Sequence, residues 1–126
     1  MKIVIDLQGA QTDSMNRGIG RYSIAFTQAL LKNAQHHDIF LALNSSLPSG
    51  LDHTLNIFND LLPQDHIHIW QTPSPVAMLH LQNHTRQKIA ECIRESFLAS
   101  LQPDILHITS LFEGFTDDAV TSIAIQ

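Results

Sequence analysis

Short apolar runs alternate with longer amphipathic segments along the chain, and this alternation limits the fold more than any other feature. The runs suit buried strands at about residues 3–5, 38–43, 66–70 and 105–108, and the amphipathic segments suit helices at about residues 21–34, 51–62 and 84–101. Strands separated by helices pair in parallel through right-handed crossovers. The sequence therefore predicts an α/β fold, with a Rossmann-like, doubly wound, mainly parallel sheet and flanking helices.

Local patterns refine this expectation. Ile3-Val4-Ile5 has no polar position, which is typical of a strand covered on both faces. We expect Pro48-Ser49-Gly50 to interrupt the chain and Asp117-Asp118 to stand at the start of another helix. Two helices should each bury one apolar side, formed in the first by Tyr22, Phe26, Ala29 and Leu30, and in the other by Ile89, Cys92, Ile93, Phe97 and Leu101.

Size and charge exclude several classes of protein. The 126 residues fit one domain and fit two poorly. Only seven Lys and Arg residues are scattered over a chain of net charge −5, which argues against a nucleic-acid partner. No stretch approaches the roughly 20 apolar residues of a membrane span. Cys92 is the only cysteine, which excludes a disulfide within the chain and favours a reducing, cytoplasmic compartment.

A glycine–arginine segment is the first candidate for binding. Doubly wound sheets bind ligands where their strands end, and Arg17-Gly18-Ile19-Gly20-Arg21 opens the helix after the first strand. Gly18 and Gly20 allow the backbone to approach a ligand closely, and Arg17 and Arg21 suit phosphate or sugar hydroxyls. A glycine-assisted helix start with two solvated arginines explains the same residues equally well. Neither a P-loop nor a dinucleotide fingerprint is present, so no nicotinamide or flavin cofactor is predicted.

The same rule marks residues 8–21, 44–48, 71–75 and 107–115 as the segments to search for a site. His107 lies in the last of them and either faces a binding cleft or forms a hydrogen bond beneath the loop. His66 and His68 share one strand face, and His80 and His84 stand four residues apart, a spacing that metal sites use. Neither pair has a third ligand, so we predict no metal site.

Two segments carry a family resemblance. The first is Ile5-Asp6-Leu7-Gln8-Gly9-Ala10-Gln11-Thr12 followed by Asn16-Arg17-Gly18-Ile19-Gly20-Arg21-Tyr22-Ser23, and the second is Leu101-Gln102-Pro103-Asp104-Ile105-Leu106-His107-Ile108-Thr109-Ser110-Leu111-Phe112-Glu113-Gly114. Together they resemble the N-terminal domain of bacterial family 4 retaining glycosyltransferases, notably the mannosyltransferases of O-antigen and related polysaccharide assembly. The resemblance spans residues 1–126.

The resemblance implies the acceptor-side half of a GT-B fold, in which a second Rossmann-like domain binds the sugar nucleotide. It implies that Arg17, Gly18, Gly20, Arg21 and His107 contact donor or acceptor, and it assigns no catalytic residue. The full-length enzyme would move a hexose, expected to be mannose from a donor such as GDP-mannose, to a glycan or lipid-linked acceptor. It would work in the cytoplasm or peripherally at the inner membrane, with no further cofactor.

The family's donor-binding domain has no counterpart in this sequence. We therefore expect the chain to be truncated, catalytically inert by itself and prone to self-association through its Phe112 to Gln126 region. In the full-length enzyme, replacing Gly20 by Val should reduce transfer and leave the fold intact. The alternative, from a different class, is a non-catalytic α/β binding or interaction module.

Overall fold

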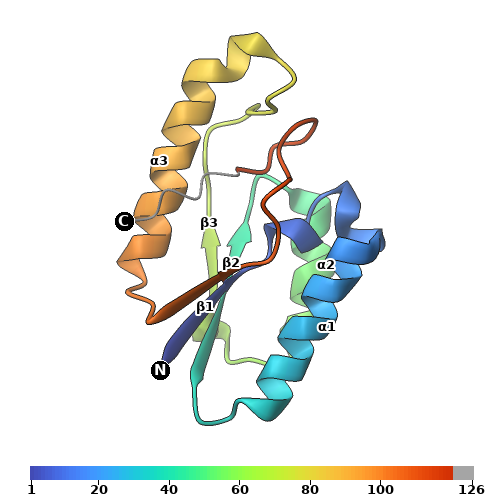
Figure 1. Cartoon of the computed structure of the whole chain (residues 1–126), viewed down its shortest axis with the longest axis vertical. Coiled ribbons are helices and arrows are strands. Elements are labelled where there is room, and N and C mark those ends of the chain that lie inside the picture. The colour runs from blue at the N-terminus through green and yellow to red at the C-terminus, as the bar shows by residue number, and fades with distance from the viewer. Residues whose placement is uncertain (121–126) are drawn as a thin grey trace.

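The computed structural model describes residues 1–120, which alternate between strands and helices (Figure 1). The strands are β1 (Lys2–Asp6), β2 (Asp38–Asn44), β3 (Ile67–Trp70) and β4 (Ile105–Ile108). The α-helices are α1 (Gly18–Asn33), α2 (Pro48–Phe58) and α3 (His84–Ser100). Short 3₁₀ turns lie in the connections: η1 (Gln8–Ala10), η2 (Asp13–Asn16), η3 (Gln64–His66) and η4 (Leu81–Asn83).

The described strands form one parallel sheet in the order β3-β2-β1-β4. The chain moves outward from β1 to β2 and β3, and then returns to the other side of β1 to form β4. This reversal is the topological switch point of a doubly wound sheet, beside which ligands bind at the carboxyl ends of the strands. The parallel sheet with flanking helices confirms the predicted Rossmann-like α/β class.

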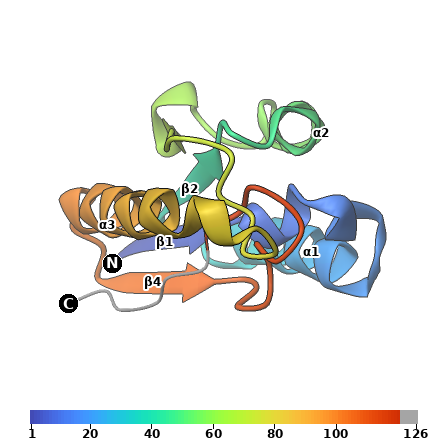
Figure 2. The ribbon, with the colours of Figure 1, turned by 90° about the horizontal axis from the view of Figure 1, so that it is seen from above.

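Helices cover both faces of the sheet, with α3 on the opposite side from α1 and α2 (Figure 2). The core on the α1 and α2 side contains Ile5, Leu41 and Phe58. The core on the α3 side contains Val4 and Leu98. Successive residues of β1 thus point into different cores, as the period of a strand requires. Val4 and Ile5 are both 0% exposed, which confirms a strand covered on both faces.

Two helix starts differ from the sequence expectation. α1 begins at Gly18 rather than near residue 21, and α2 begins at Pro48 and ends at Phe58. The expected interruption at Pro48 is therefore wrong, because proline suits the first position of a helix, where its missing N–H needs no partner. Asp117 and Asp118 lie in irregular structure. The rest of the helix expected to follow them falls outside the described residues.

The buried faces of α1 and α3 also differ from expectation. Exposed members of the expected apolar sides are Tyr22, Ala29, Ile89, Cys92 and Ile93. In α1, buried Ser23 and Thr27 take their place, and their hydroxyls donate to carbonyl oxygens four residues back at 2.7 and 2.8 Å. A hydroxyl that is satisfied inside its own helix can be buried. In α3 the inward face holds Ala90, Arg94 and Leu98.

Candidate functional site

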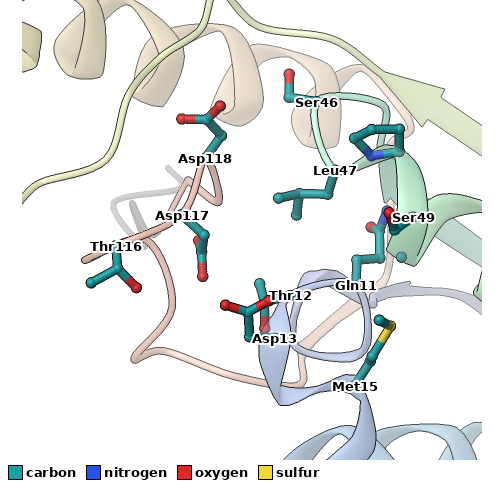
Figure 3. Close-up of a pocket in the computed structure, with 12 residues that line it drawn as sticks. Gln11, Thr12, Asp13, Met15, Ser46, Leu47, Ser49, Thr116, Asp117 and Asp118 are labelled. Carbon is teal, nitrogen blue, oxygen red and sulfur yellow. The ribbon is translucent and has the colours of Figure 1, made fainter.

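A polar pocket of about 320 Å³ opens at the carboxyl edge of the sheet (Figure 3). Its walls come from the segments that follow β1, β2 and β4, and this is the edge at which doubly wound sheets bind ligands. We call it the acid pocket, and its lining residues are Gln11, Thr12, Asp13, Met15, Ser46, Leu47, Pro48, Ser49, Gly50, Thr116, Asp117 and Asp118.

Buried amide side chains hold the walls of the acid pocket together. Gln11 Nε2 donates to the Asn44 carbonyl, and the Asn44 N–H donates to Gln11 Oε1, both at 2.8 Å. Gln8 pairs in the same way with the backbone of Val120, at 2.6 and 2.8 Å. Asn44 Nδ2 also donates to Gln8 Oε1 at 3.1 Å. Because these groups are buried and paired, they fix the three loops relative to one another.

The first turn of α2 forms one wall of the acid pocket. A Cβ on Gly50 would lie 1.9 Å from the Gln11 carbonyl oxygen, so only glycine lets α2 approach this closely. Leu47, at the N-cap of α2, makes no side-chain capping bond. The first N–H groups of α2 are therefore not occupied by a cap and can donate to a ligand oxygen.

Carboxylates dominate the charge of the acid pocket, and none of its lining residues within 1–120 is a lysine or arginine. Burial raises the pKa of Asp117 above 3.8, and the negative charges of Glu113 and Asp13 act in the same direction. Hydrogen bonds oppose this rise, because the Ala119 and Gly114 N–H groups donate to Asp117 Oδ1 at 2.9 and 3.1 Å. The pocket therefore suits a neutral, hydroxyl-rich ligand better than a phosphate.

Glu113 adjoins the acid pocket through its hydrogen bond with Thr12 and is 8% exposed. The Thr12 hydroxyl donates to Glu113 Oε2 at 2.7 Å, and the Ser110 hydroxyl donates to Oε1 at 3.0 Å. Gly9 lets these segments meet, since a Cβ there would lie 2.7 Å from Ser110 Cβ. Glu113 thus joins the loop after β1 to the loop after β4.

The predicted glycine–arginine segment forms the first turn of α1, which we call the glycine–arginine turn (residues 17–21). Arg17 is the N-cap of α1, and both Arg17 and Arg21 are exposed. A Cβ on Gly18 would meet nothing within 4 Å, whereas a Cβ on Gly20 would lie 2.2 Å from the Ser14 carbonyl oxygen. The expectation that Val at position 20 leaves the fold intact is therefore wrong, because backbone atoms cannot move aside cheaply.

The predicted site residues lie outside the acid pocket. Arg21 lines a separate hollow of about 250 Å³ between α1, η2 and α2. His107 lies on β4 opposite Ile5, and its ring stacks on Phe26 of α1 with centroids 4.6 Å apart. The structure therefore brings Arg17, Gly18, Gly20 and Arg21 together on one turn and places His107 against the body of the same helix.

The histidine pairs show no metal geometry. His66 and His68 both stack against Phe40, with centroids 4.3 and 5.6 Å apart, so their shared face is confirmed although His66 belongs to η3. Burial chiefly lowers the pKa of His68. His80 precedes η4 and His84 begins α3, so the two do not share a helix. No three His, Cys, Asp or Glu residues among residues 1–120 are grouped to hold a metal ion.

The segments expected to bind contain seven of the twelve residues that line the acid pocket, but residues 71–75 contribute none, and no acid of the pocket was predicted as a site residue. Asp13 follows the first strand and lies within residues 8–21, whereas Asp117 and Asp118 follow the fourth strand, two and three residues beyond the expected segment 107–115. A signal was available, because the carboxyl ends of parallel strands meet at one edge of the sheet. Within the described helices, none has the length and apolarity of a membrane span.

The parallel sheet, its switch point and the polar pocket at its carboxyl edge define a Rossmann-like α/β domain with a candidate ligand site. The chain is 36% identical over 124 residues to the serotype-specific mannosyltransferase WbdA of Escherichia coli, an alignment that covers 98% of the chain and 15% of the relative. Two further Escherichia coli proteins of the same name are 31% and 29% identical over 98 residues, which cover 77% of the chain and 12% of each relative.

The chain is therefore homologous to a part of these mannosyltransferases and spans 12 to 15% of their length. This homology confirms the resemblance to bacterial mannosyltransferases. No family model matches the chain, and no solved structure matches it.

Proposed function

We propose that the chain forms the acceptor-side domain of a glycosyltransferase. The reaction would move a hexose, mannose by the name of the relatives, from a sugar nucleotide such as GDP-mannose to a glycan or lipid-linked acceptor on the cytoplasmic side of the inner membrane. The observation that carries this proposal is an acid-lined pocket at the carboxyl edge of a domain homologous to mannosyltransferases. Because the chain spans 15% of the first relative, donor chemistry would depend mainly on residues outside it, and the domain alone would be inert.

The acid pocket is the proposed acceptor site. Carboxylate oxygens of Asp13, Asp117 and Asp118 accept hydrogen bonds from sugar hydroxyls, and the hydroxyls of Ser46 and Thr116 both donate and accept. The same carboxylates repel phosphate, which disfavours the pyrophosphate of a sugar nucleotide in this pocket. A neutral glycan end therefore suits the pocket better than the donor does.

The glycine–arginine turn is the proposed contact to the donor. Arg17 and Arg21 are exposed cations at the start of α1, where free N–H groups and the helix dipole also favour an anion. The open space around Gly18 leaves the backbone accessible. His107 is assigned an indirect role, because its ring packs on Phe26 and supports α1 from the sheet side.

Amide chemical-shift mapping of the isolated chain tests the acceptor site. Titration with a short mannose oligosaccharide should shift the amide resonances of residues 12–13, 46–47, 49–50 and 116–118. Asp118→Ala should weaken this binding by roughly tenfold, since a hydrogen bond to a charged group contributes about 1.5–3 kcal/mol. Glu91→Gln, on α3 and not among the residues that line the acid pocket, is the matched control and should bind normally.

Calorimetry with GDP-mannose tests how strongly the isolated chain binds the donor. We expect weak heat or none, because the acid pocket repels phosphate and two exposed arginines make a sparse anion site. Strong nucleotide binding that shifts the acid-pocket resonances would overturn the assignment of the two sites. If neither ligand binds at millimolar concentration, the non-catalytic interaction module becomes the better description.

A further inference from the structure

Glu113 stands at the junction of the two sites proposed above. Its carboxylate accepts hydrogen bonds from the Thr12 hydroxyl at 2.7 Å and the Ser14 hydroxyl at 3.5 Å on one oxygen. The other oxygen accepts from Ser110 at 3.0 Å. Thr12 is 3% exposed, so both partners of the shortest bond are withdrawn from water. A buried carboxylate that is held by hydroxyls from two loops resists displacement of either loop.

A continuous chain of contacts leads from Glu113 to the glycine–arginine turn. The Thr12 hydroxyl, which donates to Glu113, accepts the Ser14 N–H at 3.1 Å and so caps η2. The Ser14 carbonyl accepts the Arg17 N–H at 2.9 Å. The same carbonyl oxygen lies 2.2 Å from where a Cβ of Gly20 would be, so the first turn of α1 rests directly on η2. Movement of Thr12 would therefore move the turn.

A second set of contacts leads from Glu113 to the acid pocket. The next residue, Gly114, donates its N–H to Asp117 Oδ1 at 3.1 Å, which closes the loop that supplies Thr116 and Asp117 to the wall. Thr12, on the segment after β1, lines the same pocket. The hydrogen bond between Glu113 and Thr12 therefore ties one pocket wall to the other.

We propose that Glu113 is a positioning residue that sets the glycine–arginine turn relative to the acid pocket. It would not touch either substrate, and it would act by keeping the donor contact and the acceptor contact at a fixed separation. A displacement of about 1 Å between reacting groups is enough to lower turnover about a hundredfold. This inference rests on the proposed function, but the contacts that carry it do not.

Hydrogen exchange of the chain tests the positioning role without any activity assay. Glu113→Ala should speed exchange at the Ser14, Met15 and Arg17 amides by roughly tenfold or more, because it removes charge-assisted hydrogen bonds. The β1 amides of Val4 and Ile5 should keep their protection. Thr12→Val should reproduce the effect, and Glu113→Gln should restore most of the protection. Glu91→Gln, which removes an acid of α3 that pairs with Lys88, should leave exchange at these amides unchanged.

Each outcome bears on the proposal. Unchanged exchange in both Glu113→Ala and Thr12→Val would overturn it, and so would equal loss of protection in β1, which would make Glu113 a general stability residue. In a longer transferase that contains this domain, Glu113→Ala should lower kcat at least tenfold, and Glu113→Gln should recover it. If Glu113→Ala has the expected effect on hydrogen exchange but the longer parent protein shows no transferase activity, the result contradicts the proposed function and leaves the positioning role intact.

Discussion

The side chains of Asp6 on β1 and Arg94 on α3 form a buried ion pair, and each is only 1% exposed. Arg94 donates from two of its nitrogens to the same oxygen, Asp6 Oδ2. The other carboxylate oxygen, Oδ1, accepts the Gln8 N–H at 3.0 Å. The pair thereby connects α3 to the turn that carries Gln8 and the amide network of the acid pocket.

Removing one member of this pair should be costly. Arg94→Met leaves the Asp6 carboxylate buried without its cation, and we expect a loss of about 3–5 kcal/mol in the free energy of unfolding. The double variant Asp6→Asn, Arg94→Met removes both charges and keeps an acceptor for the Gln8 N–H. Urea denaturation should show that the double variant recovers at least half of the loss. Equal stability of the two variants would show that the unpaired charge of Asp6 is not the cause of the loss.

Two glycines of the glycine–arginine turn form a matched pair for mutation. A Cβ at position 20 would lie 2.2 Å from Ser14 O and 2.6 Å from Met15 Cα, so Gly20→Ala should lower the free energy of unfolding by about 1–3 kcal/mol or more. Gly18→Ala meets nothing and should leave it unchanged or raise it by up to about 1 kcal/mol. Thermal unfolding by circular dichroism would separate them, and similar midpoints would show that η2 yields easily.

The stability of the domain should depend on the charge of Asp117. Because burial raises its pKa in the folded state above 3.8, the native state holds a proton that the unfolded state has released in the window between the two pKa values. The stability linked to this proton is present below pH 3.8 and is lost as pH rises through the folded pKa. Asp117→Asn keeps the Oδ1 acceptor of the Ala119 and Gly114 N–H groups and removes the charge.

Asp117→Asn should therefore have a Tm equal to or above that of the parent at pH 7, and this difference should shrink toward pH 4. Asp117→Ala removes the acceptor as well and should be less stable than the Asn variant by about 1–3 kcal/mol. Differential scanning fluorimetry across this pH range measures both differences. An Asn variant with a lower Tm at every pH would show that the ionised carboxylate is favourable where it lies.

Apolar side chains on the loop after β4 predict self-association. Phe112 is 92% exposed and Phe115 is 57% exposed, and Leu111 beside them is 47% exposed. Side chains of this size on one short loop favour contact with a partner surface. Light scattering should show a mass that rises with concentration, and Phe112→Ser should lower that rise severalfold. A constant monomer mass in the parent chain would refute the prediction. Leu61→Ser, which changes an exposed leucine far from this loop, is the control and should associate like the parent chain.

The sequence predicted the strands better than the faces of the helices. Apolar runs such as Ile3-Val4-Ile5 report burial directly, because no polar group there needs a partner. The inward face of α1 could not be read in this way, since Ser23 and Thr27 satisfy their hydroxyls within the helix. The burial of Arg94 could not be predicted from the sequence either, because Asp6, the acid that pairs with it, lies 88 residues earlier in the chain.

The sequence indicated which loops form the candidate site, but not which of their side chains meet there. The rule for doubly wound sheets indicated the carboxyl edge, where the acid pocket lies. Which side chains meet there depends on long-range hydrogen bonds such as those between Gln11 and Asn44 and between Gln8 and Val120. Periodicity and local motifs carry no information about such pairs, so Glu113 and Asp117 could be assigned only from the structure.

The strand order has a consequence for how the chain is made. β1 occupies an inner position of the sheet, yet its partner on one side is β4, with Asp6 opposite Ile108. A ribosome therefore releases β1 long before the strand that completes its hydrogen bonding exists. During that interval the edge of β1 that pairs with β4 has no partner strand. An unpaired apolar edge slows folding and favours pairing with other chains. Nascent chains stalled before residue 105 should accordingly bind chaperones, and release should coincide with emergence of β4.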